Sequence, residues 1–141
     1  MEEKNRAWKT VSSKYLFRRP WLTVRCEDML LPNGNHIPEY YILEYPDWVN
    51  TIAITKDGKF VFVRQYRPGI ERTCYELCAG VCEKEDASPL VSAQRELWEE
   101  TGYGKGNWQE YMVISANPST HTNLTSVSYT HLRAHETRRH L

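Results

Sequence analysis

Hydrophobic residues in the first half of the chain fall into short segments that are rich in aromatic and β-branched side chains. Two of these segments, Trp21–Leu30 and Ile37–Tyr45, flank the polar stretch Pro32–Asn35, which contains an Asn-Gly pair. Asn-Gly readily adopts the positive φ angles that a tight hairpin turn requires. The pattern therefore predicts an antiparallel β-hairpin layer near the N-terminus.

A second hairpin is predicted directly after the first. The segments Trp48–Thr55 and Phe60–Gln65 are joined by Lys56–Lys59, which contains Asp-Gly, the other strong hairpin pair. The run Phe60–Val63 is apolar without interruption, which is typical of a strand that is covered on both faces. We expect the two segments to pair with each other.

One α-helix is well marked by its ends. Ser88 is a good N-cap, Pro89 is a good first helical residue, and Gly102 is placed to end the helix. At about 100° per residue, three apolar side chains gather into one stripe. These are Leu90, Ala93 and Leu97.

Three carboxylates border this apolar stripe. Glu96, Glu99 and Glu100 are spaced so that they fall within about a quarter-turn of one another. Like charges at this spacing repel and destabilise an isolated helix. Arg95 can neutralise one of them and a divalent cation could neutralise the rest. The alternative is an acidic helix face that is simply solvated.

The composition is that of one folded domain. The 141 residues are 40% hydrophobic and 26% charged, which excludes a disordered chain. The 18 basic and 18 acidic side chains cancel, which argues against a general nucleic-acid binder. Acids nevertheless predominate between Glu71 and Glu100, around the predicted helix.

Targeting signals are not evident. No apolar run approaches the ~18 residues that a membrane helix needs, and Met1–Arg6 lacks the apolar core of a secretory signal. We therefore expect a cytoplasmic protein without a membrane partner. In a reducing compartment its cysteines would remain free thiols. These are Cys26, Cys74, Cys78 and Cys82.

The predicted helix and the loop before it carry a specific motif. Arg95–Tyr103 reads Arg-Glu-Leu-Trp-Glu-Glu-Thr-Gly-Tyr, and Gly80 lies upstream of it. The segment resembles the Nudix box, whose second half it matches at every fixed position. In the first half, the family glutamate falls on Asp86 counted from Gly80 and on Ala87 counted from Arg95. The loop is one residue longer, and the equivalent of that glutamate stays open.

The resemblance implies a metal-dependent hydrolase. Nudix enzymes cleave a nucleoside diphosphate linked to another moiety, using Mg²⁺ or Mn²⁺, cations that prefer oxygen ligands. It makes Glu96 and Glu100 the main carboxylate ligands, and Glu99 a third ligand or a water-positioning residue. The main-chain carbonyl of Ala79 would be a further ligand, and Arg95 would orient the carboxylates. The catalytic residues implied are Arg95, Glu99 and Glu100.

Two further segments resemble the ADP-ribose pyrophosphatase branch of that family. They are Arg64–Pro68 and Tyr75–Gly80, the second with Cys78 where the branch commonly has proline. By this resemblance Arg67 would bind the diphosphate, for which the guanidinium fork is suited, and Glu76 would belong to the same substrate site. The implied reaction converts ADP-ribose to AMP and ribose 5-phosphate.

The resemblance also suggests a role for N-terminal aromatic residues. The branch often places an N-terminal strand layer across a homodimer, where aromatic side chains sandwich adenine. Trp21 and Tyr40 are the candidates, and ordinary packing within the hairpin is the alternative. The partners expected are a nucleotide sugar and, for the complete protein, a second copy of the chain.

The fold class implied is α/β, a Nudix-like α/β/α sandwich with a mixed sheet and an N-terminal antiparallel hairpin layer. We expect the layer in residues 1–47, a partial Nudix core in 48–125, and a foreign or disordered tail in 126–141. The catalytic glutamate of the branch would lie beyond Leu141, so the C-terminal part is expected to be incomplete. One alternative is a natural short variant whose residues 126–129 form the next strand. A second is a non-catalytic module that binds a nucleotide or a partner.

Overall fold

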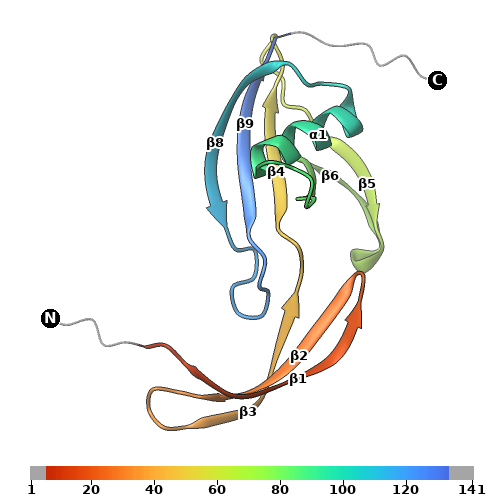
Figure 1. Cartoon of the computed structure of the whole chain (residues 1–141). Coiled ribbons are helices and arrows are strands. Elements are labelled where there is room, and N and C mark those ends of the chain that lie inside the picture. The colour runs from red at the N-terminus through yellow and green to blue at the C-terminus, as the bar shows by residue number, and fades with distance from the viewer. Residues whose placement is uncertain (1–5, 134–141) are drawn as a thin grey trace, which may run out of the picture. The chain divides into compact units, whose positions relative to one another are not determined.

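The computed structural model describes residues 6–133 of the chain. These residues belong to two compact units. The first consists of Met1–Tyr45 with Ala116–Asn123, and the second of Pro46–Ser115 with Leu124–Leu141. Residues 1–5 and 134–141 lie outside the described part. Figure 1 follows the chain from the N-terminus in red to the C-terminus in blue.

The first unit is a three-stranded antiparallel sheet in the order β1-β2-β3. Its strands are β1 (Lys9–Arg19), β2 (Leu22–Leu30) and β3 (His36–Glu44). Gly34 has a φ of 87° in the turn between β2 and β3, as the Asn-Gly pair predicts. The predicted hairpin layer is therefore confirmed, and β1 adds a strand that the sequence analysis did not expect.

The second unit contains a four-stranded mixed sheet in the order β7-β4-β9-β8. The β4–β9 pair is parallel, whereas β4–β7 and β8–β9 are antiparallel. The mixed sheet that we expected is therefore present. Its strands are β4 (Trp48–Ile54), β7 (Cys78–Val81), β8 (Gly106–Ile114) and β9 (Thr125–Leu132).

Strand β9 begins where we expected a foreign or disordered tail. Thr125–Leu132 lies between β4 and β8, and most of its residues are buried. Disorder is therefore wrong for this stretch, and the alternative of a further strand describes it better. The foreign origin of residues 126–141 stays a prediction, and residues 134–141 lie outside the described part.

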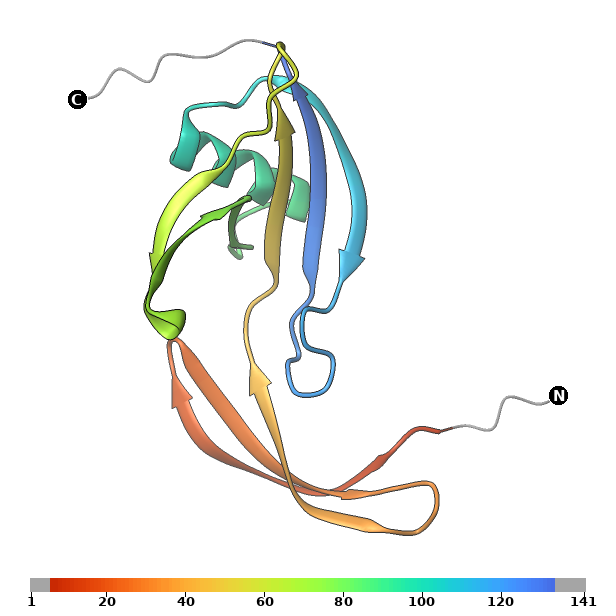
Figure 2. The ribbon, with the colours of Figure 1, turned by 180° about the vertical axis from the view of Figure 1, so that it is seen from behind.

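Helix α1 (Pro89–Thr101) has the ends that the sequence predicts. The Ser88 hydroxyl accepts a hydrogen bond from the Val91 amide at 3.3 Å, and Gly102 ends the helix at a φ of 75°. The helix packs on β7, β4 and β9, in front of the sheet in Figure 1 and behind it in Figure 2. The core between helix and sheet includes Val49, Ala53, Cys78, Ala93 and Leu97.

The sandwich expected from the resemblance has helices on both faces of the sheet. Within residues 6–133, α1 is the only α-helix. The described residues thus form the sheet and one of the two helical layers. The opposite face of β4 carries Ile52 and Ile54, both half-buried.

The second predicted hairpin pairs differently from our expectation. The Asp-Gly turn forms, with Gly58 at a φ of 79°, but Phe60 makes only an isolated bridge to Ile54. Phe60 and Phe62 are 55% and 53% exposed, so the expected burial on both faces is wrong. The chain instead continues into a two-stranded sheet of β5 (Val63–Arg67) and β6 (Arg72–Glu76). A short 3₁₀ turn, η1 (Pro68–Ile70), joins these two strands.

Candidate active site

Arg95 is the centre of an ion-pair cluster on helix α1. Its Nη1 lies 2.8 Å from Glu96 and 3.3 Å from Glu99. These contacts draw two of the three predicted carboxylates toward the positive Arg95 guanidinium. The attraction offsets the repulsion that we expected from their spacing. Arg95 therefore orients Glu96 and Glu99 geometrically, and its part in catalysis stays a prediction.

Asp86 is a further ion-pair partner of Arg95, which we did not predict from the sequence. Its Oδ2 accepts hydrogen bonds from Arg95 Nε at 3.3 Å, from Arg95 Nη2 at 3.0 Å and from the Ser92 hydroxyl at 2.7 Å. The guanidinium, followed by the Ser92 hydroxyl, lowers the pKa of Asp86, and Asp86 in turn raises the pKa of Arg95. Of Asp86 and Ala87, only Asp86 has a carboxylate and holds Arg95; its equivalence to the family glutamate stays a prediction.

The open edge of β7 presents main-chain oxygens that do not pair with β4. Cys82 donates its amide to Asp47 O at 2.8 Å, and the β4–β7 register continues from that pair. Because bonded and non-bonded pairs alternate in an antiparallel ladder, the carbonyls of Ala79 and Val81 point away from β4. Val81 O confirms this direction, since it accepts a hydrogen bond from Arg95 Nη2 at 3.0 Å. The Ala79 carbonyl thus lies on the same open edge of the sheet.

Gly80 allows a carboxylate to lie directly against the strand. A Cβ placed on Gly80 would be 2.0 Å from Glu96 Cδ and 2.2 Å from its Oε1, far inside van der Waals contact. Any side chain at this position would displace Glu96. The absence of one is therefore what brings the Glu96 carboxylate beside the backbone that carries the Ala79 carbonyl.

Cys78 is the next residue on the same face of β7. Its side chain is 1% exposed and belongs to the core cluster with Ala53 and Leu97. Burial is the main cause that raises the pKa of the Cys78 thiol, and the negative charges of Glu100 and Glu96 add to it. Cys78 is thus part of the core between the sheet and α1 rather than of its exposed edge.

Arg67 and Glu76 face each other across the β5–β6 hairpin. Arg67 Nε lies 2.8 Å from Glu76 Oε1 and 3.0 Å from Oε2, and Nη2 also contacts the carboxylate. This pairing raises the pKa of Arg67 and lowers the pKa of Glu76. Glu100 lies close enough to Arg67 to contribute to the shift. Of the three predicted helix acids, Glu100 is thus the one that acts on the expected diphosphate-binding arginine.

The oxygen donors of this site suit a hard divalent cation. Within residues 6–133, no three acidic, histidine or cysteine side chains already converge as a ready metal centre. Mg²⁺, however, usually retains several waters and needs only one or two protein carboxylates. Glu96 beside the Gly80 backbone, Glu100 one turn further and the Ala79 carbonyl supply such oxygen atoms. The residues present fit Mg²⁺ or Mn²⁺ bound with part of its water shell.

Trp21 and Tyr40 both lie in the first unit, whereas the helix acids lie in the second. Trp21 is 80% exposed, at the turn between β1 and β2. Tyr40 packs edge-on against Trp8, with ring centroids 5.5 Å apart, and its hydroxyl donates to the Ser119 carbonyl. Tyr40 therefore has a packing role, and adenine binding by either residue stays a prediction.

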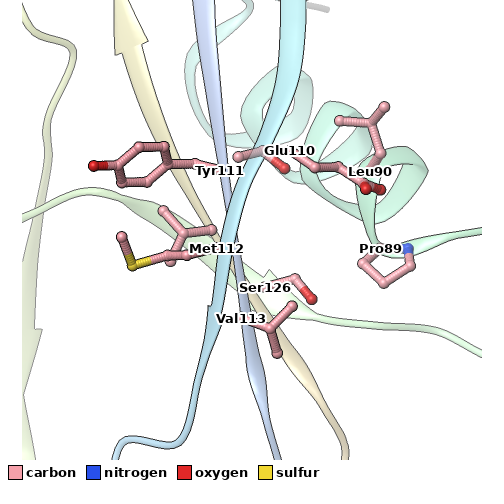
Figure 3. Close-up of a pocket in the computed structure, with 9 residues that line it drawn as sticks. Pro89, Leu90, Glu110, Tyr111, Met112, Val113 and Ser126 are labelled. Atoms are coloured by element: carbon pink, nitrogen blue, oxygen red, sulfur yellow. The ribbon is translucent and has the colours of Figure 1, made fainter.

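A pocket of about 360 Å³ lies between the first turn of α1 and strands β8 and β9. Figure 3 shows Glu110 on β8 with its carboxylate toward Leu90. None of the predicted metal or substrate residues lines this pocket. The predicted metal ligands lie instead on α1 and β7, and the predicted diphosphate residues lie on the β5–β6 hairpin.

Comparison with known proteins decides the family. The NUDIX domain matches residues 45–140, more than half of the chain. The chain belongs to the Nudix family. Residues 8–43 match a second family, the nucleoside diphosphate sugar hydrolase N-terminal domain. The recognition made from Gly80 and Arg95–Tyr103 is thereby confirmed.

The curated relatives of this Nudix chain include two ADP-ribose pyrophosphatases. That of Bacillus subtilis (strain 168) is 39% identical over 95 residues, which cover 67% of this chain and 50% of that protein. That of Mycobacterium tuberculosis (strain ATCC 25618 / H37Rv) is 28% identical over 111 residues, covering 79% and 53%. The methanol dehydrogenase activator of Bacillus methanolicus is 40% identical over 95 residues, covering 67% and 50%. The chain spans about half the length of the curated relatives it matches.

A solved Nudix-like fold confirms the architecture. The crystal structure of an ADP compounds hydrolase matches with a TM-score of 0.80 at 21% identity, covering 94% of this chain and 71% of that chain. At this identity the likeness supports the fold alone, namely a mixed α/β Nudix core preceded by an antiparallel sheet. None of the helical structure in residues 6–133 is long and apolar enough to cross a lipid bilayer.

Proposed function

We propose that this Nudix chain uses Mg²⁺ or Mn²⁺ to hydrolyse the diphosphate bond of a nucleoside diphosphate sugar, with ADP-ribose as substrate and AMP and ribose 5-phosphate as products. The observation that carries the proposal is the contact of Glu96 with Gly80, which no side chain at position 80 would permit. It brings a helix carboxylate beside the strand edge where the Ala79 carbonyl points.

Each residue of the proposed metal site has a distinct role. Glu96 and Glu100 would hold the cation, together with the Ala79 carbonyl. Arg95, itself fixed by Asp86, keeps Glu96 oriented and holds Glu99 nearby. Glu99 is 52% exposed and can position a water at the mouth of the site. A bound Mg²⁺ supplies positive charge opposite the diphosphate and makes the attacking water more acidic.

Arg67 is the residue that we assign to the substrate diphosphate. Its planar fork can donate two parallel hydrogen bonds to phosphate oxygens. In this structure Glu76 occupies that fork. A diphosphate would therefore have to share or displace Glu76, so both residues belong to the proposed substrate site.

Two kinds of comparison support a nucleotide sugar as substrate. The N-terminal match is to nucleoside diphosphate sugar hydrolases, and two of the relatives are ADP-ribose pyrophosphatases. For the complete protein we also propose a homodimer in which Trp21 and Tyr40 contact the adenine ring.

The test is a product assay combined with a binding assay. The 141-residue chain is incubated with ADP-ribose and Mg²⁺, and AMP and ribose 5-phosphate are measured, with Glu100→Gln as the matched control. A version extended with the C-terminal part of a relative is assayed in parallel. We expect metal-dependent product from the extended wild type and at least about a hundredfold less from its Glu100→Gln variant. Equal product from both would refute the proposal.

A second candidate function is a module that binds a nucleotide without cleaving it. The altered first acid of the motif, Asp86, which binds Arg95 in this structure, favours this alternative. ADP-ribose that raises the unfolding temperature without product formation in either version would favour this alternative.

A further inference from the structure

Ser92 is a fully buried serine in the first half of α1. Its hydroxyl lies 2.7 Å from Oδ2 of Asp86, in the loop before the helix. A serine inside a helix commonly donates to the main-chain carbonyl four residues earlier. That acceptor, Ser88 O, is 3.5 Å away, at the limit of a hydrogen bond. The hydroxyl has one proton to donate, and the geometry gives it to the Asp86 carboxylate.

Oδ2 of Asp86 is the atom at which several donors meet. Besides the Ser92 hydroxyl, it accepts from the Glu83 amide at 3.3 Å and from Arg95 Nε and Nη2 at 3.3 and 3.0 Å. The Ser92 hydroxyl, at 2.7 Å, is the closest of these donors. The Asp86 side chain is only 11% exposed. A carboxylate with so little hydration depends on its hydrogen-bond donors for its position.

The hydrogen bonds continue from Asp86 through Arg95 to a predicted metal ligand. Nη1 of Arg95 lies 2.8 Å from Oε1 of Glu96, and this carboxylate lies against Gly80. Because Nε and Nη2 of Arg95 bind Asp86, the orientation of the planar guanidinium depends on where Asp86 lies. A connected series of hydrogen bonds therefore runs from the buried Ser92 hydroxyl to the Glu96 carboxylate.

We infer that Ser92 is a positioning residue, whose hydroxyl holds Asp86 where it orients Arg95 and, through Arg95, the Glu96 carboxylate. The inference rests on the proposed function, because it assumes that Glu96 ligates the cation. Hydrogen-bond partners behind a metal ligand commonly change metal affinity by about 10- to 100-fold when they are removed. Ser92 lies two hydrogen bonds behind Arg95, so we expect the lower end of that range.

The experiment measures Mn²⁺ binding to the 141-residue chain by calorimetry. Ser92→Ala removes the donor and keeps a strong helix former in α1, whereas Ser92→Thr keeps a hydroxyl. Ser128→Ala is the matched control, because Ser128 is a serine on β9 that is only 1% exposed. We expect about tenfold weaker Mn²⁺ binding in Ser92→Ala, affinity within about threefold of wild type in Ser92→Thr, and no change in Ser128→Ala.

A second variant covers the case in which threonine is too large for the buried position. Should Ser92→Thr fail to fold, Ser92→Cys keeps a weaker donor in a similar space. We expect its Mn²⁺ affinity to lie between those of Ser92→Ala and the wild type.

A purely structural role is separated by a double mutant. If Ser92 acts through Asp86, then Ser92→Ala causes no further loss of Mn²⁺ affinity in an Asp86→Ala background. Three results would each overturn the inference while the proposed function stands: a further loss in that background, equal affinity of wild type and Ser92→Ala, or an equal loss in Ser92→Ala and in the variant that keeps a donor. Absence of Mn²⁺ binding to the wild-type chain would overturn both.

Discussion

The guanidinium of Arg95 and the carboxylate of Asp86 are joined by two hydrogen bonds to one oxygen, Oδ2, at 3.3 and 3.0 Å. This pair ties the loop before α1 to the middle of the helix. The remaining donors of Arg95 reach Glu96, Glu99 and the Val81 carbonyl. One arginine thus connects the loop, the helix acids and the strand edge, and a charge-assisted network of this kind fixes their relative positions.

Asp86→Asn should make the free energy of unfolding depend less on pH in the acidic range. Arg95 lowers the pKa of Asp86 in the folded chain, so the folded state binds a proton there less readily than the unfolded state. The stabilisation is complete above the ordinary aspartate pKa of about 3.9 and is lost as the pH falls through the lower, folded-state value. Urea unfolding between pH 2.5 and pH 7, values chosen to bracket that range, measures this.

The control for Asp86→Asn is Glu85→Gln, which removes one exposed negative charge from the same loop. We expect Asp86→Asn to lower stability at neutral pH and to show a shallower decline in acid than the wild type. A decline of equal steepness in Asp86→Asn and wild type would contradict the role given to the Arg95 pair.

Gly80→Ala should damage the site more than the fold. The new Cβ would overlap Glu96 Cδ at 2.0 Å, so the carboxylate must move away from the strand edge. We expect Mn²⁺ affinity to fall by at least about tenfold. The free energy of unfolding should change little, because the atoms that the new Cβ meets are the far end of a flexible side chain. Calorimetry and urea titration measure the two effects. Gly69→Ala is the control, because nothing lies within 4 Å of the added atom there. A Gly80→Ala variant with the Mn²⁺ affinity of the wild type would count against the proposed metal site.

Arg67→Lys should weaken the binding of ADP-ribose without changing the binding of Mn²⁺. Lysine keeps the positive charge but loses the planar fork that pairs with two phosphate oxygens. We expect about tenfold weaker binding of ADP-ribose, corresponding to about 1.4 kcal/mol. Arg64→Lys is the matched control, because residue 64 lies on the opposite face of β5. Similar losses in both variants would contradict a specific role of Arg67, and no loss in either would show that the positive charge alone suffices.

Thr51→Val should stabilise the chain. The Thr51 hydroxyl is buried on β4, and its oxygen has no hydrogen-bond partner within the described residues. A buried hydroxyl without a partner is unfavourable, so its replacement by a methyl group of similar shape should raise the unfolding free energy by about 1 kcal/mol. Ser92→Ala gives the contrast, because the Ser92 hydroxyl donates to Asp86 at 2.7 Å. A destabilised Thr51→Val would mean that the hydroxyl has a partner in solution.

Helix α1 illustrates what could be predicted from sequence. Ser88, Pro89 and Gly102 act on the backbone within one turn of themselves, so their effect is local and legible in the chain. The same holds for the Asn-Gly and Asp-Gly turns, where Gly34 and Gly58 adopt positive φ. The motif Arg95–Tyr103 likewise identified the family, because its acids and arginine occupy fixed positions on one helix.

Strand pairing was predicted less well, for a physical reason. The apolar run at Phe60–Val63 indicates a strand but carries no information about its neighbour, and the chain pairs β5 with β6 rather than with β4. Residues 125–132 illustrate the same limit, since their place between β4 and β8 depends on hydrogen bonds to segments far away in sequence.

What the sequence by itself determined is therefore the helix, its caps, the tight turns and the row of acids on one helical face, all of which arise from interactions between near neighbours. Only the tertiary structure decided that Asp86 binds Arg95 and that Glu96 lies on the bare backbone of Gly80. The first contact requires the loop before α1 to fold back onto the middle of the helix. The second requires β7 and α1 to pack in one register, which burial of their shared core sets.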